Sequence, residues 1–309
     1  MISRRLVRIK TLQTLYAFNR SENGIVTDYE TMLQEKFDAV YDAYLFVIDF
    51  PYHLREFALE KQNREKSKFY PKDEKIDHYR LLNGTKLVEN IHNQVVGHAK
   101  EVFDWSYLEV RFDQWLRDIK EWDFVRDYGI FFEPNHDQQK EFLESLYFAL
   151  LDTHEGFNEG IEEIYPYWFD DHLFTAKDIV KTISLSENLE SLNLKKRTTY
   201  KTEEAIWAKE LLRNTVENSD EYNGLIAKVA SNWDPARIAV MDLLIIKLAI
   251  TEFLNCPEIP LRVTINEYLE ITKSYSTPSS SKFVNGILDK LRLDLESRGE
   301  IRKTGRGLK

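Results

Sequence analysis

The sequence is poor in cysteine, glycine and proline. Its 309 residues include one cysteine, 11 glycines and 8 prolines. The single thiol, Cys256, cannot form an internal disulfide and cannot by itself anchor a zinc ribbon. Sparse turn-forming residues, beside abundant helix-compatible residues, favour an all-α fold over a turn-rich β architecture. We therefore expect a helical protein from a reducing compartment.

Long uninterrupted apolar runs are also missing. The most apolar stretch, residues 238–254, contains Asp242, Lys247 and Glu252 and is short for a bilayer span. The opening residues are charged from position 4 and lack the pattern of a secretory signal. These features predict a cytoplasmic protein without membrane spans, in which the apolar stretch is the buried central helix of a bundle.

Motifs of common enzymes are absent as well. No P-loop, GxGxxG, GxSxG or HExxH pattern occurs, so we expect no catalytic residue, cofactor or metal. Two Glu-x-x-His pairs, Glu89 with His92 and Glu133 with His136, match the spacing used in dimetal carboxylate bundles. With 52 acids among 309 residues, about one of the seven histidines has an acid three positions earlier by chance. Pro134 also places the second pair at a helix start, so a dimetal enzyme is the weaker alternative.

Charge is distributed unevenly along an acidic chain. The formal net charge of -10 argues against nonspecific binding of polyanions. Cations nevertheless gather near both ends of the sequence: Arg4, Arg5, Arg8 and Lys10, and then Arg298, Arg302, Lys303, Arg306 and Lys309. Either these ends are simply solvated, or one of them binds nucleic acid locally.

Apolar spacings of three and four residues predict a series of helices. The expected ranges are 3–18, 29–60 with an interruption at Pro51, 85–105, 107–126, 134–154, 157–169, 176–191, 203–216, 220–230, 235–254, 266–275 and 281–297. Asn23-Gly24 indicates a break, residues 61–75 a charged connector, and residues 192–202 a polar linker.

Local signals are clearest in the last third of the chain. Thr264-x-x-Glu267 matches a capping box at a helix start, while Pro257 and Pro260 end the preceding helix. Gly286 lies inside the last expected helix, where it costs about 1 kcal/mol relative to Ala. A tight helix crossing at Gly286 is the explanation we expect.

Three ordered segments resemble the NusB family. Residues 265–291, INEYLEITKSYSTPSSSKFVNGILDKL, are similar to the family's ending, in which INE-x-x-E-x-x-K is followed by a loop and KFVNG-x-LDK. RIAVMDLLIIKLAITEFL (237–254), followed by EIPLRV, resembles its central helix and loop, and RRLVRIKTLQTLYAF (4–18) resembles its arginine-rich opening. The resemblance covers residues 4–18 and about 203–291. It implies that residues 1–20 are the first helix of a NusB-like core, 21–200 a helical insertion or extra domain, and 201–309 the rest of the core with a basic tail.

The resemblance implies a function in transcription. NusB proteins are helical adaptors that bind boxA RNA of ribosomal RNA transcripts together with NusE, a small-subunit ribosomal protein, and help RNA polymerase resist termination. The expected partners are therefore a boxA-like single-stranded RNA, NusE and the RNA polymerase antitermination complex. The alternative is a helical interaction scaffold without RNA binding, in which residues 21–200 dock a basic partner.

The first expected helix carries candidate RNA contacts. Arg4 and Arg8 are four residues apart with Arg5 beside them, and planar guanidinium groups suit both phosphates and base edges. Gln13 can reach a base from the same helix, or simply belong to an exposed polar face. If RNA binding is their role, replacing the three arginines by Ala lowers RNA affinity and leaves stability almost unchanged. The alternative is that they hold this helix onto the bundle.

A second group of candidates lies near the last expected helix. Ser280, Ser281 and Lys282 open that helix, and a helix N-terminus attracts phosphate. Phe283 can stack on an unpaired base or pack in the core. Lys273 either contacts RNA or is a solvated charge at a helix end.

Partner contacts are implied by the resemblance alone. It places Tyr16 and Asp242 where the family meets NusE, and a cationic ribosomal protein favours an acidic surface. Tyr16 can instead be a core aromatic, whereas Asp242 lies within an apolar helix and needs a reason to be there. We expect Asp242→Lys to weaken NusE association with helix content intact. The loop STPSSS lacks the acids that are usual at this place in the family.

Overall fold

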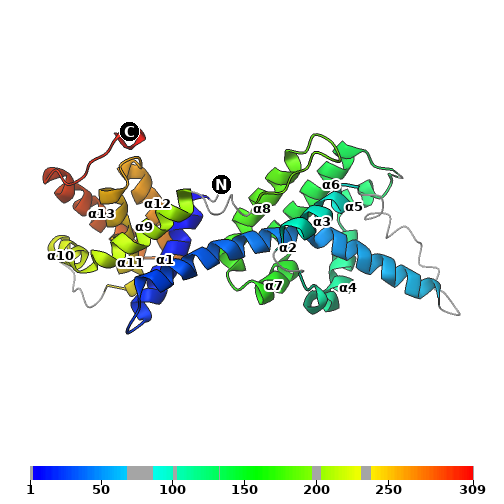
Figure 1. The fold of residues 1–309 in the computed structure, drawn as a ribbon, viewed down its shortest axis with the longest axis horizontal. Coiled ribbons are helices and arrows are strands. Elements are labelled where there is room, and N and C mark those ends of the chain that lie inside the picture. Colours follow the sequence, from blue (N-terminus) through cyan, green and yellow to red (C-terminus); the bar gives the residue numbers. More distant parts are fainter. Residues whose placement is uncertain are drawn as a thin grey trace. The chain divides into compact units, whose positions relative to one another are not determined.

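The computed structural model describes residues 3–67, 86–99, 103–131, 133–196, 203–230 and 238–308 (Figure 1). These residues form helices and connecting loops, with no strand among them, so the predicted all-α class is confirmed. Within the same ranges, no helix is both long enough and apolar enough to cross a membrane.

The helices of the described residues follow one another in chain order. Their bounds are α1 Arg4–Arg20, α2 Val26–Lys66, α3 Lys86–His98, α4 Ser106–Lys120, α5 Asp123–Tyr128, α6 His136–Phe148, η2 Ala149–Thr153, α7 Glu155–Ile164, α8 Trp168–Ser184, α9 Glu203–Glu217, α10 Ser219–Val229, α11 Val240–Asn255, α12 Leu261–Tyr275, α13 Ser280–Ser297 and η5 Gly305–Leu308.

The chain divides into two compact units, residues 1–37 with 200–309 and residues 38–199. In the first unit α1 packs against α9 and α11, and α11 packs against α12 and α13 (Figure 1). In the second unit α6 packs against α8, and α7 packs against α4 and α8. The first unit is therefore assembled from two stretches of chain that are far apart in the sequence.

The centre of the first unit is α11. Eleven of its residues are buried, including the apolar run from Leu244 to Ile246 and Phe253. Their burial on several sides of one helix matches the predicted buried central helix. The helix begins at Val240, while the expected start at residues 235–237 lies outside the described residues.

The predicted interruption at Pro51 is wrong, because α2 continues through it. A proline inside a helix removes one backbone hydrogen bond and crowds the carbonyl four residues earlier, which costs about 3 kcal/mol. Here that carbonyl belongs to Val47, which is fully buried, and Tyr147 Oη donates to the neighbouring Ile48 carbonyl at 2.5 Å. Burial of this part of α2 outweighs the local cost.

Other bounds also differ from the expected ranges, most of all at α8, which covers Trp168–Ser184 where a helix over residues 176–191 was expected. The expected helix 107–126 divides into α4 and α5, and the expected helix 134–154 into α6 and η2. α2 extends to Lys66, into the expected connector, whereas residues 68–75 lie outside the described residues. Of the expected linker, residues 192–196 are non-helical and residues 197–202 lie outside the described residues.

The predicted capping box is also wrong. α12 begins at Leu261, directly after Pro260, so Thr264 lies inside the helix. Its hydroxyl donates to the buried Glu252 carboxylate at 2.7 Å, and the Glu267 side chain pairs with α1. The proline starts the helix earlier than the capping residues do, which leaves both side chains available for tertiary contacts.

Gly286 does not mark a helix crossing. A Cβ added at Gly286 meets nothing within 4 Å, and the same is true of Gly224 in α10. Gly160 in α7 is different, because a Cβ there lies 2.8 Å from the Trp115 ring. The tight helix crossing expected at Gly286 is therefore wrong. At Gly160, by contrast, the absence of a side chain lets the Trp115 ring lie close to the α7 backbone.

Gly286→Ala is expected to raise the free energy of unfolding by about 1 kcal/mol, because alanine restricts the unfolded chain and meets no atom in the folded one. Urea denaturation of the full chain measures the change. Gly224→Ala, the matched control in another exposed helix, should give a similar gain, and Gly160→Ala should instead destabilise. A loss of stability in Gly286→Ala would contradict the open environment described for this position.

Candidate nucleic-acid interface

The start of α1 places two arginines at an unfavourable end of a helix. Ser3 caps α1 by accepting a hydrogen bond from the Leu6 amide at 3.1 Å. Cations at a helix N-terminus oppose the helix dipole, and the first turn contains no acid. Arg5 and, one turn later, Arg8 pair instead with acids of other helices.

Arg8 is held inside the first unit. Its guanidinium donates to both Glu252 oxygens at 2.8 and 2.7 Å, and the two side chains are 2% and 0% exposed. The guanidinium carbon lies 5.3 Å from the Trp207 ring centroid and 5.8 Å from that of Tyr268. Burial lowers the pKa of Arg8, but hydrogen bonding and the charge of Glu252 outweigh it and raise the pKa overall. Arg8 thus joins α1 to α11. For Arg8, this agrees with the alternative that the arginines hold the first helix onto the bundle.

Arg5 and Arg4 lie closer to solvent than Arg8. Arg5 donates to both oxygens of Glu267 at 2.9 Å, and 44% of its side chain is exposed. Hydrogen bonding to Arg5 lowers the pKa of Glu267. Arg4 is exposed, 6.0 Å from the Trp207 ring centroid, and forms no ion pair with a described residue. These two arginines are the accessible part of the predicted arginine edge.

Gln13 lies beside the last turn of α12. Its Nε2 donates to Tyr275 Oη at 3.2 Å. This pair and the Arg5–Glu267 pair have the same sequence separation, 262 residues, so α1 and α12 run in the same direction. The two pairs are eight residues apart, or about 12 Å along each helix. Lys273, two residues before Tyr275, is 59% exposed and pairs with Glu270.

Asp242 is buried rather than presented on the surface. It is 4% exposed, and its two oxygens accept hydrogen bonds from Ser276 Oγ at 2.5 Å and Ser280 Oγ at 2.8 Å. The carboxylate therefore ties α11 to the loop before α13 and to the start of that helix. The reason for an acid at this position in an apolar helix is internal hydrogen bonding.

The start of α13 presents some of the predicted residues to solvent. Ser280 is buried with its hydroxyl engaged by Asp242, whereas Ser281 is half-buried and Lys282 exposed. Lys282 makes no ion pair within the described part of the chain. Phe283 is half-buried, so its ring is neither fully enclosed nor fully accessible.

Tyr16 remains accessible on α1. It is half-buried, and Arg20 lies against it, with Nε donating to the Tyr16 hydroxyl at 3.3 Å. Its environment differs from that of Asp242, because the Tyr16 ring borders solvent.

The basic tail is partly used inside the fold. Lys303 Nζ donates to the carbonyls of Glu252 at 3.2 Å and Cys256 at 2.8 Å, at the C-terminal end of α11. A cation is favourable there because the last helical carbonyls carry partial negative charge. Arg298 pairs with Asp294 and Glu300. The side chain of Arg306 and all of residue 309 lie outside the described residues.

Apart from Tyr16, the predicted residues fall into three sets. Arg4 and Arg5 lie at the start of α1. Near the α12–α13 junction lies a second set: Gln13, Lys273, Ser281, Lys282 and Phe283. Arg8, Ser280 and Asp242 are interior residues that hold these helices together. Sequence reasoning missed Glu252, Glu267 and Trp207, of which Glu252, an acid in an apolar helix, offered a signal.

Comparison with known proteins defines the domain that carries these helices. Residues 171–292 match the model of the NusB family. The chain contains a NusB family domain. The match runs from within α8 to residue 292 in α13 and so includes α9 to α12, whereas α1 lies outside it and packs on α9 and α11.

The curated relatives of this domain are proteins named transcription antitermination protein NusB. That of Salinibacter ruber is 44% identical over 102 residues, which are 33% of this chain and 64% of the relative. Those of Chloroherpeton thalassium and Desulfatibacillum aliphaticivorans are 43% and 39% identical and cover 32% and 30% of this chain. The chain spans 46% and 66% of the length of these two relatives. No solved structure matched the chain.

Proposed function

We propose that this protein is an RNA-binding transcription antitermination factor. Its NusB family domain binds boxA-type RNA of ribosomal RNA transcripts together with NusE, within the RNA polymerase antitermination complex. The observation that carries the proposal is the family match over residues 171–292, whose curated relatives are named for antitermination. The proposed role is that of an adaptor, and we assign no residue a catalytic function.

The proposed RNA surface follows α1 and the α12–α13 junction. Arg4 and Lys282 are exposed cations without ion pairs among the described residues, which leaves them available for phosphates. Arg5 contacts RNA if a phosphate replaces Glu267, and Gln13, Lys273, Ser281 and Phe283 supply the remaining contacts. Arg8 and Ser280 act indirectly, because their side chains hold the two helices in place. Tyr16 is the proposed contact with NusE.

The test of this function is binding to a boxA-like RNA with and without NusE. We expect weak binding by the chain alone and tighter, cooperative binding by the pair, since two modest surfaces on one strand gain effective concentration. Fluorescence anisotropy with the purified full chain measures both affinities. Equal affinity with and without NusE would contradict the adaptor role, and no RNA binding in either case would favour the interaction scaffold.

Replacing Arg4 and Lys282 together by Ala is expected to weaken RNA binding and flatten its salt dependence. Each lost phosphate contact to a single strand reduces the steepness of the negative slope of log affinity against log salt by about 0.7. The matched control replaces two exposed cations of the second unit, Arg64 and Lys181, and changes the net charge equally. An equal loss of affinity in the control would show that net charge, rather than this surface, determines binding.

A further inference from the structure

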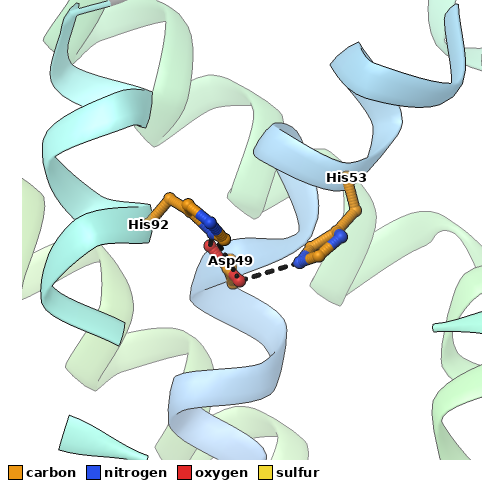
Figure 2. A group of neighbouring side chains, drawn as sticks. All are labelled: Asp49, His53 and His92. Atoms are coloured by element: carbon orange, nitrogen blue, oxygen red, sulfur yellow. Dashed lines mark hydrogen bonds and ion pairs between the residues drawn. The ribbon is translucent and has the colours of Figure 1, made fainter. Parts of the chain in front are cut away.

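Three side chains of the second unit converge at one point between α2 and α3. Asp49 and His53 are one turn apart on α2, and His92 comes from α3 (Figure 2). His53 Nε2 lies 2.9 Å from Asp49 Oδ2, and His92 Nδ1 lies 3.0 and 3.1 Å from the two Asp49 oxygens. One ligand atom from each residue lies within 4.8 Å of the others. Figure 2 shows both rings turned toward the carboxylate.

In the described part of the chain, no lysine or arginine forms an ion pair with the buried Asp49 carboxylate. Its side chain is 3% exposed, and its partners among the described residues are the two imidazoles. A buried carboxylate is costly unless a positive charge neutralises it. Neutral imidazoles donate hydrogen bonds but supply no charge, whereas a bound cation would neutralise the carboxylate directly.

Aromatic neighbours hold both imidazole rings. The His92 ring stacks on Tyr52 with centroids 3.5 Å apart and planes 3° from parallel. The His53 ring stacks on Trp105 at 4.9 Å. The His53 side chain is 25% exposed and the His92 side chain is 21% exposed, so both imidazoles lie partly in solvent. The aromatic contacts thus orient both imidazoles beside the Asp49 carboxylate.

The pairs suggested by Glu-x-x-His spacing do not assemble. Glu89 pairs with Arg55 at 3.0 Å instead of joining His92 in a site. His136 contacts Asp137 and Ser186. The group that the structure brings together uses His92 with a different carboxylate, that of Asp49.

We propose that Asp49, His53 and His92 bind one divalent transition-metal ion of the zinc class, with water in the remaining position. Two imidazole nitrogens and one carboxylate oxygen are ligands that suit this class of ion and not magnesium or calcium. Tetrahedral coordination with bonds of about 2.0 to 2.2 Å separates ligand atoms by roughly 3.3 Å, so the observed groups need only small movements. The ion neutralises Asp49 and links α2 to α3. None of the three ligand residues belongs to the proposed RNA surface.

The experiment uses the untagged full chain, stripped of metal with a chelator. Calorimetric titration with zinc is expected to show one ion per chain, and zinc should raise the melting temperature because it binds the folded protein. Cobalt(II) in place of zinc should give a visible absorption band from its ligand field. His53→Gln with His92→Gln should lower zinc affinity by more than about 100-fold and abolish the band.

Two further variants make the result specific. His92→Gln alone keeps a donor for Asp49 and covers the case in which the double variant fails to fold. His172→Gln is the matched control, since it removes a histidine of the same unit whose Nδ1 contacts the Phe169 carbonyl. Unchanged binding in this control and loss in His92→Gln support the site. No zinc binding by the natural chain, or equal binding by His92→Gln, overturns the proposal.

Discussion

Arg8→Ala is expected to lower the free energy of unfolding by about 3 to 5 kcal/mol. The substitution leaves the Glu252 carboxylate, which is 0% exposed, without its cation, and uncompensated buried charges are strongly destabilising. The Thr264 hydroxyl remains as a donor to Glu252 but carries no charge. Urea denaturation of the full chain, followed by circular dichroism, measures the loss.

A double variant separates charge from packing at this pair. Arg8→Met with Glu252→Gln removes both charges and is expected to recover a large part of the stability lost in Arg8→Ala. Arg4→Ala is the control, because an exposed arginine without an ion pair contributes little to stability. A loss below about 1 kcal/mol in Arg8→Ala would contradict a buried, interior role. The expectation that all three arginines can be replaced without loss of stability therefore does not extend to Arg8.

Asp242→Lys is expected to lower the free energy of unfolding by about 3 kcal/mol or more. An ammonium cannot accept the hydrogen bonds of Ser276 and Ser280, and the site is 4% exposed. Helix content should fall with this loss, contrary to the expectation from sequence. Thermal melting and far-ultraviolet circular dichroism report both quantities.

Asp242→Asn separates this internal role from a contact with NusE. Asparagine keeps the size and one acceptor oxygen, so the expected loss of stability is about 1 kcal/mol. If the carboxylate acts only inside the fold, the folded Asn variant should bind NusE normally. A large fall in association with folding intact would instead support direct contact between Asp242 and NusE, which stays a prediction.

Local periodicity predicted much of the fold, and its failures share a cause. The apolar pattern of α11 and the bounds of α9 and α13 are readable because neighbouring residues determine them. Pro51 was misinterpreted because burial in the second unit outweighs a local helix-breaking rule. Thr264-x-x-Glu267 matched a capping pattern, yet both side chains serve contacts with other helices. Tertiary contacts determine these positions, and no local pattern contains them.

The candidate site was harder to predict than the fold. The sequence places Arg4, Arg5 and Arg8 together, but only Arg8 is enclosed, because Glu252 approaches it from 244 residues away. Asp242 attracted attention because it is an acid in an apolar helix. Glu252 is another acid in the same helix, and the same reasoning would have indicated a buried cationic partner for it.

The proposed metal site also depends on a residue that is distant in the sequence. The spacing of Asp49 and His53 is visible in the sequence, but nothing local indicates that His92 joins them.

The division of the chain also has a consequence for the order of folding. Residues 38–199 are one continuous stretch, whereas the other unit needs residues 1–37 and 200–309 together. A ribosome releases the N-terminal residues first, so α1 emerges long before α9 and α11, on which its apolar face packs. Until α11 appears, Arg8 has no Glu252 and Leu12 has no core. We therefore expect the middle of the chain to fold during synthesis, and the unit of α1 and α9–α13 to form only after residues 200–309 have been made.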